Sequence, residues 1–158
     1  MDEKPTADPN NIREMNFKTD LGWICEIWLK GIKETAPPLI SGKPWDSRLS
    51  VMIENTQEAN EKYVYEKDGI IKGFTTAGIP DDKDYISELY VESQFQGQGI
   101  GKQLLNKLKE NHSELTLDVY EMNANAIVFY KKRDFKVSGE KKCPHTGSPK
   151  LKMKWEKT

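Results

Sequence analysis

The residues best suited to chemistry in this sequence form a short glycine-rich stretch just past its midpoint. Gln96-Gly97-Gln98-Gly99-Ile100-Gly101-Lys102 places three glycines at alternate positions. Residues 85–91 before it alternate and are rich in aromatic and β-branched side chains, whereas the leucines after it recur with helical spacing. A helix that begins at such a turn leaves its first backbone N–H groups unpaired and unshielded, so a phosphate can lie on them. The stretch therefore predicts an anion-binding turn between a strand and a helix.

Two well-known phosphate-binding motifs do not fit this stretch. A P-loop requires Ser or Thr after its Gly-Lys pair, but Gln103 follows Lys102. A Rossmann fingerprint has Gly-x-Gly-x-x-Gly near the start of a βαβ unit, whereas these glycines are spaced by two and come late in the chain. We therefore expect neither a nucleoside triphosphate nor a dinucleotide. A turn whose glycines serve only close packing is the structural alternative.

The composition predicts one globular domain. The 158 residues suit a single domain, and 36% hydrophobic with 31% charged residues is typical of a folded protein with a charged surface. No apolar run is long enough to span a membrane and no signal-peptide pattern begins the chain, so we expect a cytoplasmic protein with no membrane partner. Cys25, Cys143 and His145 complete neither a disulfide framework nor a tetrahedral ligand set, so no metal is expected.

Charge is distributed unevenly along the chain. Residues 1–95 hold 11 basic and 18 acidic side chains, whereas residues 96–158 hold 13 basic and 7 acidic ones, for a net charge of −1. This pattern suits an anionic cofactor at the C-terminal part and favours a cationic acceptor at the N-terminal part. Because the overall charge is close to zero, a nucleic-acid partner is not expected.

The periodicity predicts an order of elements. Residues 1–16 are polar and proline-containing, which predicts a flexible tail. A helix begins at Asp20 as its N-cap, a proline-rich loop covers 36–45, and Asp68-Gly69 turns a hairpin. The predicted helices are 20–32, 46–59, 99–111 and 123–133, and the predicted strands are 63–66, 70–77, 85–91, 115–120, 135–143 and 150–155. The strand, helix, strand order over 85–120 predicts that strands 85–91 and 115–120 pair in parallel.

Two motifs at the right separation resemble one known family. Gln96, Gly99 and Gly101 form Gln-x-x-Gly-x-Gly, which resembles the acetyl-CoA signature of the GNAT N-acetyltransferase superfamily. A second block resembles that family's Asn-x-x-Ala-x-x-x-Tyr-x-x-x-Gly-Phe motif and consists of Asn123, Ala126, Tyr130 and Phe135. One departure is Asp134, which stands in place of the glycine. Asp tolerates left-handed backbone better than most residues, so the turn can survive.

The resemblance implies a fold and an activity. The fold is the GNAT acyl-CoA N-acyltransferase fold, an α/β architecture with a mixed, mostly antiparallel sheet of six to seven strands, a central parallel splayed pair and about four flanking helices. It would occupy residues 17–156 as a single domain. The implied reaction transfers acetyl from the co-substrate acetyl-CoA to a primary amine of a small molecule or peptide, by direct attack in a ternary complex. An acyl-CoA sensor that acts through a protein partner is the alternative, and since relatives often dimerise, a homodimer is an expected assembly.

The resemblance also assigns roles to single residues. Tyr130 would protonate the departing thiolate, and otherwise it is a core aromatic. Glu88 is the candidate base, directly or through water, since strand alternation places it with Ile86 and Tyr90; the alternative is a solvent-facing carboxylate. Substrate-binding candidates are Leu39, Trp45 and Tyr90, although Trp45 also suits a core. The cofactor-binding candidates are Leu89, Tyr90, Val91, Gln96, Gly97, Gln98, Gly99, Ile100, Gly101, Lys102, Tyr130 and Asn123, the last of which could instead cap its helix.

Overall fold

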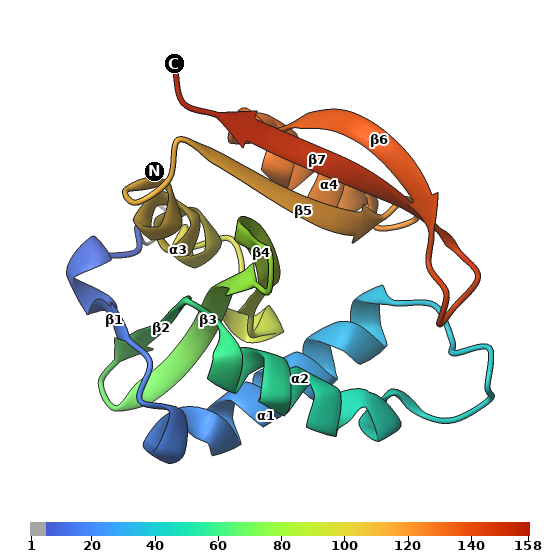
Figure 1. Cartoon of the computed structure of the whole chain (residues 1–158). Helices are drawn as coiled ribbons and strands as arrows, with labels where there is room; N and C mark the ends of the chain where they lie inside the picture. The colour runs from blue at the N-terminus through green and yellow to red at the C-terminus, as the bar shows by residue number, and fades with distance from the viewer. Residues whose placement is uncertain (1–5) are drawn as a thin grey trace, which may run out of the picture.

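The computed structural model describes residues 6–158, which form one seven-stranded sheet with four α-helices around it (Figure 1). The order of strands across the sheet is β1-β2-β3-β4-β5-β7-β6. No helix in the described part of the chain is long and apolar enough to cross a membrane. The elements are β1 (Ile12–Glu14), α1 (Phe17–Thr35), α2 (Leu49–Glu58), β2 (Glu61–Lys67), β3 (Ile70–Ile79), β4 (Asp82–Val91), α3 (Ile100–Lys109), β5 (Glu114–Tyr120), α4 (Ala124–Lys132), β6 (Lys136–Lys142) and β7 (Pro149–Glu156). The predicted α/β fold class is confirmed.

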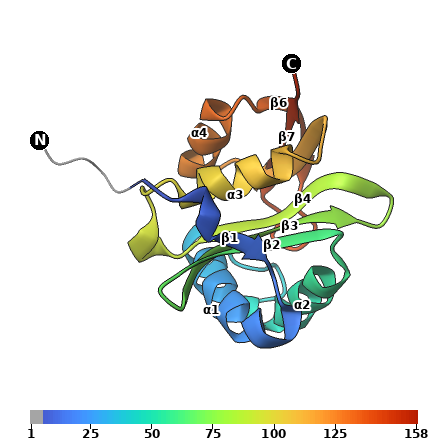
Figure 2. The same cartoon turned by 90° about the vertical axis from the view of Figure 1, so that its left-hand side faces the viewer.

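Helices cover the sheet from both sides (Figure 2). Helices α1 and α2 pack on one face of the N-terminal strands, and α3 with α4 lies on the opposite side. The amphipathic pattern of α3 explains its position, because its apolar residues at i, i+4, i+5 and i+8 are all buried. On the other face, Ile24 and Trp28 of α1 pack with Phe74 of β3. The sheet therefore separates two hydrophobic cores.

The sheet is continuous at only one point between β4 and β5. This pair is the one parallel pair, and its ladder consists of the single register position Tyr85–Thr116. The Tyr85 hydroxyl donates a hydrogen bond to Oδ2 of Asp118 at 2.8 Å, which ties the two strands together beside that position. Beyond it the strands separate, so the sheet divides into a half formed by β1–β4 and a half formed by β5, β7 and β6 (Figure 1). The predicted splayed parallel pair is confirmed.

A β-bulge in β4 decides which side chains face α1. The register between β3 and β4 shifts at Ser87, so that Thr76 lies opposite Glu88 while Ala77 lies opposite Ile86. Ile86 consequently packs in the α3 core, as Leu89 does, whereas Tyr90 packs in the α1 core. The expectation that Ile86 shares a face with Glu88 is wrong, because simple alternation does not allow for the extra residue.

The N-terminal segment departs from the predicted flexible tail. Within residues 1–16, β1 pairs with β2, and the Ala7 N–H donates to the Gln98 carbonyl at 2.8 Å; residues 1–5 lie outside the described residues. Arg13 donates two hydrogen bonds to Asp20, at 2.8 and 3.0 Å, from within this segment. Helix α1 is capped by Asn16, so the prediction of Asp20 as N-cap is wrong. The polar composition of this segment did not predict a strand, because β1 contributes backbone pairing and charged contacts rather than an apolar face.

We expect His112 to stabilise the fold in a pH-dependent way. Its ring, 5% exposed, lies between Glu61 and Asp84, with Nδ1 2.6 Å from the Asp84 carboxylate. Burial lowers the pKa of His112, but the hydrogen bonds to Asp84 and Glu61 outweigh it and raise the pKa above its ordinary value. The stabilisation is therefore fully present below the unfolded pKa of about 6.5 and is lost as pH rises through the raised folded pKa.

Urea unfolding at pH 6 and pH 9 checks this expectation. His112→Gln should lower the free energy of unfolding by about 1–3 kcal/mol at pH 6 and by less at pH 9. Glu110→Gln, in the preceding turn, is the control because its carboxylate is exposed and pairs only with Lys107. An equal loss from His112→Gln at both pH values would contradict the pH-dependent contribution.

A pair of glycines in α1 tests how closely this helix packs on β4. A Cβ at Gly31 would lie 2.4 Å from Cδ1 of Tyr90, whereas a Cβ at Gly22 would meet nothing within 4 Å. Gly31→Ala should therefore destabilise the protein by about 1–3 kcal/mol through overpacking. Gly22→Ala should stabilise it by about 0.5–1 kcal/mol, since alanine is the better helix former. Thermal or urea unfolding of both variants measures the difference, and equal effects would show that α1 does not press on Tyr90.

Candidate active site

Three polar side chains meet where the sheet splays. Glu88 and Tyr90 come from the α1-facing side of β4, and Tyr130 comes from α4 on the opposite side of the sheet. Packing fixes both tyrosine rings, because Tyr90 stacks on Phe74 and Tyr130 lies edge-on to Phe135, with ring centroids 6.0 and 5.4 Å apart. Within residues 6–158 the hydroxyls of Tyr90 and Tyr130 have no hydrogen-bond partner, whereas the Glu88 carboxylate has the indole N–H of Trp28 as a donor. The two hydroxyls are therefore available to bind something else where the strands separate.

The environment of Glu88 changes its acidity. Burial raises the pKa of Glu88 to about 8, although the positive charge of Lys150 and the indole N–H of Trp28 act in the opposite direction. Burial and the Glu88 charge in turn raise the pKa of Tyr130 above its ordinary value, and the same two causes raise that of Tyr90. A carboxyl group with a pKa near neutrality suits a general base, and a tyrosine that stays protonated suits a proton donor. The two predicted catalytic residues are thus electrostatically coupled across the splay.

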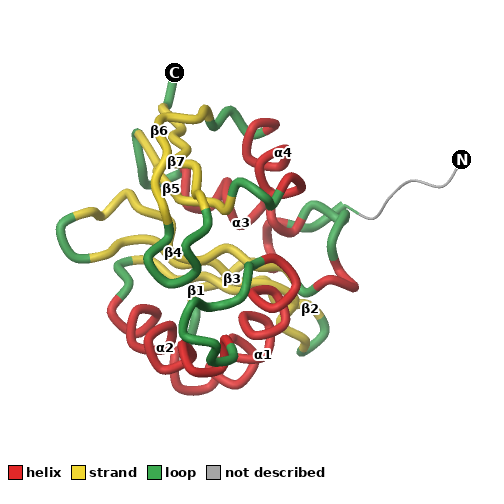
Figure 3. The backbone as a smooth tube through the Cα atoms, turned by 90° about the vertical axis from the view of Figure 1, so that its right-hand side faces the viewer, coloured by secondary structure: helices red, strands yellow, loops and turns green. Residues whose placement is uncertain are grey.

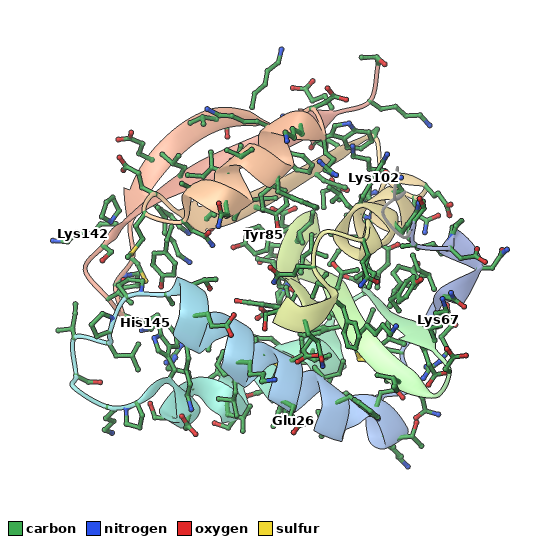
Figure 4. All side chains as sticks on the ribbon, turned by 180° about the vertical axis from the view of Figure 1, so that it is seen from behind. Glu26, Lys67, Tyr85, Lys102, Lys142 and His145 are labelled. Atoms are coloured by element: carbon green, nitrogen blue, oxygen red, sulfur yellow. The ribbon has the colours of Figure 1, made fainter. Side chains whose placement is uncertain are left out.

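The glycine turn has the geometry that the sequence predicts. Gly97 and Gly99 have φ of +81° and +88°, and Gly99 is the N-cap of α3 with no side-chain cap. In the described part of the chain, the backbone N–H groups from Gly97 to Lys102 have no hydrogen-bond partner. Gln98 and Ile100 contribute two of them, and Lys102 is exposed at the N-terminal end of α3 (Figure 4). The N-terminus of a ten-residue helix therefore presents unpaired donors to an anion.

Gln96 takes a role that the motif does not reveal. Its side-chain amide donates to the Val91 carbonyl at 2.9 Å, which ties the turn to the end of β4. Leu89 and Val91 face the α3 core, and the β4 backbone from residue 86 onward has no partner on β5. Gly101 lies inside α3, where a Cβ would meet the Phe129 ring at 3.1 Å. The exposed strand edge is the kind that an extended ligand can pair with.

The second motif positions Tyr130. Asn123 caps α4, because its Oδ1 accepts a hydrogen bond from the Ala126 N–H at 3.3 Å, as the capping alternative predicted. Its amide N–H groups remain free to donate. Asp134 has φ of +69°, which confirms that this residue takes the left-handed backbone in place of glycine. Phe135 then enters the core, where it holds the Tyr130 ring.

The substrate-binding candidates Leu39 and Trp45 lie near a contact between two loops. The Ile40 N–H donates to the His145 carbonyl at 2.8 Å, so the loop after α1 contacts the turn between β6 and β7 (Figure 3). Leu39 is buried in this loop. The Trp45 indole N–H donates to the Pro37 carbonyl at 3.0 Å, and its ring packs against the α1 core. The indole is thus used internally, as the core alternative for Trp45 predicted.

The sequence did not indicate three further residues that lie near Glu88 and Tyr90. Trp28 of α1 and Lys150 of β7 both act on the Glu88 carboxylate. Tyr120 at the end of β5 donates to, or accepts from, the Cys143 thiol at 3.3 Å, and its ring lies 4.5 Å from the Lys150 ammonium. Only Tyr120 had a local signal, since it ends the strand just before the Asn123 motif. The other two come from distant segments that the fold alone brings together.

Comparison with known proteins agrees with this geometry. Residues 34–157 match the family model described as an acetyltransferase (GNAT) domain. The chain is 27% identical to the peptidyl-lysine N-acetyltransferase YiaC of Escherichia coli over 144 residues, which cover 91% of this chain and 95% of that protein. It is also 27% identical to the spermine/spermidine N(1)-acetyltransferase of Bacillus subtilis, over 56% of this chain and 73% of that protein.

A solved structure shares the fold. The structure of yncA from Salmonella typhimurium with its cofactor acetyl-CoA superposes with a TM-score of 0.70 and 20% identity, covering 92% of each chain. The family match, the relatives and the shared fold all point to the same class of protein as the glycine turn, the splayed strands and the polar groups between them. The chain belongs to the GNAT family of N-acetyltransferases and is an acyltransferase.

Proposed function

We propose that this enzyme transfers the acetyl group of acetyl-CoA to a primary amine of a peptide or small molecule by direct attack in a ternary complex. The observation that carries the proposal is the pair formed by Glu88 and Tyr130, two coupled groups at the splay between β4 and β5. One group suits removal of a proton from the amine, and the other suits return of a proton to sulfur.

The residues of the chain fit acetyl-CoA. The unpaired N–H groups at the start of α3 suit the pyrophosphate, with Lys102 beside them as a counter-charge. The unpaired edge of β4 at 89–91 suits the amide-bearing arm, which can pair with it as an added strand. The reactive thioester would then lie beside Tyr90 and Val91, where a backbone N–H can stabilise the oxygen that becomes negative during transfer. Bound acetyl-CoA supplies an activated acyl group.

Glu88 and Tyr130 divide the proton transfers between them. An alkylamine has a pKa near ~10, so it must lose a proton before its nitrogen can attack. Glu88 accepts that proton, directly or through a water in the cleft, because its pKa of about 8 lies close to working pH. As the carbon–nitrogen bond forms and the carbon–sulfur bond breaks, Tyr130 donates its proton to the thiolate, and the second proton released by the acetylated nitrogen restores the Tyr130 hydroxyl.

A lysine side chain is the acceptor that the relatives favour most. The match to a peptidyl-lysine N-acetyltransferase spans nearly the whole of both proteins, whereas the match to a polyamine N-acetyltransferase spans about half of this chain. The cleft also suits an alkylamine on a flexible stem, since Glu88 lies within it rather than on an open surface. We therefore place peptide lysine first among amine acceptors.

Removal of the Tyr130 hydroxyl tests the proton donor. Tyr130→Phe should lower kcat about 100-fold or more while acetyl-CoA still raises the melting temperature, because binding does not need the proton. Release of CoA thiol with a lysine peptide measures kcat. Tyr63→Phe is the matched control, since its hydroxyl contacts Glu61 on β2. Unchanged turnover in Tyr130→Phe would reject Tyr130 as the acid, and absence of turnover with any amine despite acetyl-CoA binding would favour a sensor.

The pH dependence of the reaction tests the base. In wild type, kcat/KM should rise with pH through about 8, because Glu88 must lose its proton before it can accept one from the amine. Glu88→Gln should lack this rise with pH, and its kcat/KM at pH 8 should be about 100-fold lower than that of wild type. An alkylamine acceptor keeps the two titrations apart, since its own ionisation lies at pH ~10 and that of Glu88 at about 8. A step near pH 8 that persists in Glu88→Gln would show that another group is the base.

A further inference from the structure

The charge of the acceptor cleft is set by a lysine from the opposite half of the sheet. Lys150 of β7 lies opposite Tyr120 of β5 in the ladder, and its ammonium lies 4.5 Å from the centre of the Tyr120 ring. Tyr120 ends the strand that borders the splay. Lys150 therefore extends toward the gap that separates the halves, and its charge acts on Glu88 from there.

Two other lysines of this half, Lys141 and Lys154, are paired with carboxylates, but Lys150 is not. The Lys141 ammonium lies 2.8 Å from Asp118, whose side chain is 4% exposed, and the Lys154 ammonium lies 3.0 Å from Glu114. Among residues 6–158, no carboxylate lies within 4.0 Å of the Lys150 ammonium. Its ammonium lies over the face of Tyr120, which attracts a cation without neutralising it, and its charge also acts on Glu88.

More positive charge surrounds the mouth of this cleft. Lys142 and His145 lie at the β6–β7 turn, where it meets the loop after α1 (Figure 4). An Arg48 guanidinium N–H lies 3.2 Å from Nε2 of His145, so the Arg48 cation joins that of Lys142 at this turn. Asp46 lies near this loop, but Lys33 binds its carboxylate at 2.8 Å. The uneven charge of the chain thus does not translate into an acidic acceptor site, because the basic C-terminal strands supply one wall of it.

We propose that Lys150 selects amine acceptors that carry a carboxylate close to the reacting amine, such as a peptide lysine next to Asp or Glu. This rests on the proposed amine acetylation. An ammonium that lacks a carboxylate partner attracts an anionic group and repels a second cation, so a polyamine is disfavoured at the same position. Lys150 is a specificity-determining residue here, and Glu88 remains the base.

A set of matched acceptors tests this preference. Three N-acetylated peptides of equal length contain one lysine flanked by Glu, Gln or Arg, and spermidine serves as a polycation. A free amino acid and its amide show whether a small molecule satisfies the same preference. The readout is the ratio of kcat/KM values between acceptors, measured as CoA thiol release at fixed acetyl-CoA. The ratio is used because loss of Lys150 also changes the pKa of Glu88, which affects all acceptors equally.

Wild type should prefer the Glu-flanked peptide over the Gln-flanked one about 10-fold, as expected for a charge-assisted contact in a partly buried site. Lys150→Gln should reduce that ratio to about 1, and Lys150→Glu should invert it in favour of the Arg-flanked peptide and spermidine. Lys152→Gln is the control and should keep the wild-type ratio, since the Lys152 stem lies over Gly139 of β6 and its side chain is exposed.

Two results would overturn the assignment. One is a wild-type ratio of 1 or less both for the Glu-flanked over the Gln-flanked peptide and for the free amino acid over its amide, and the other is a ratio that Lys150→Gln leaves unchanged. Either would reject the role of Lys150 while amine acetylation itself stands. Absence of CoA release with every amine would instead reject the proposed function and this inference with it. A preference for the free amino acid over its amide, with no preference among peptides, would place the carboxylate on a small molecule.

Discussion

The parting of β4 from β5 is the constraint on which the rest of this structure depends. A parallel pair with one register position leaves the backbone of β4 unpaired toward β5, and unpaired backbone groups need partners from elsewhere. The bond from Tyr85 to Asp118 holds the strands together on one side of the gap, so the opening begins at a defined place. The residues to which we assign roles in the proposed reaction lie along this opening. The glycine turn continues from one of its edges, and Tyr130 reaches it from α4.

The splay also explains the acidity of Glu88. In a closed sheet, a carboxylate at this position would lie between strands and helix with no access to solvent, and such a group is rarely tolerated without a partner. At the edge of the gap, burial raises the pKa of Glu88 to about 8, although the charge of Lys150 and the hydrogen bond from the Trp28 indole act in the opposite direction. Partial burial, rather than full burial or exposure, makes this carboxyl useful near neutral pH.

The fold and the cofactor side of the site could be predicted from sequence because their determinants are local. Gly97 and Gly99 adopt left-handed backbone in a turn that the glycine spacing marks, and the Asn123 to Phe135 block positions Tyr130 within one helix. Three features could not be predicted in this way. The bulge at Ser87 adds a residue that alternation does not show, β1 forms by backbone pairing with little apolar pattern, and Asp20 contributes to a buried ion pair rather than to a cap. Each depends on a partner far away in the sequence.

The acceptor side is assembled from α1, β4, β5 and β7, which explains why residue patterns reveal so little of it. Trp28, Glu88, Tyr120 and Lys150 become neighbours only when the two halves of the sheet meet at Tyr85. Such a cleft can change its charge through one residue on β7 without disturbing the glycine turn, since the two lie on different edges of the opening. In the proposed reaction the cofactor contacts the same backbone groups whatever the acceptor is, whereas the acceptor contacts side chains. A fold that separates these two requirements can keep one reaction while the accepted amine changes.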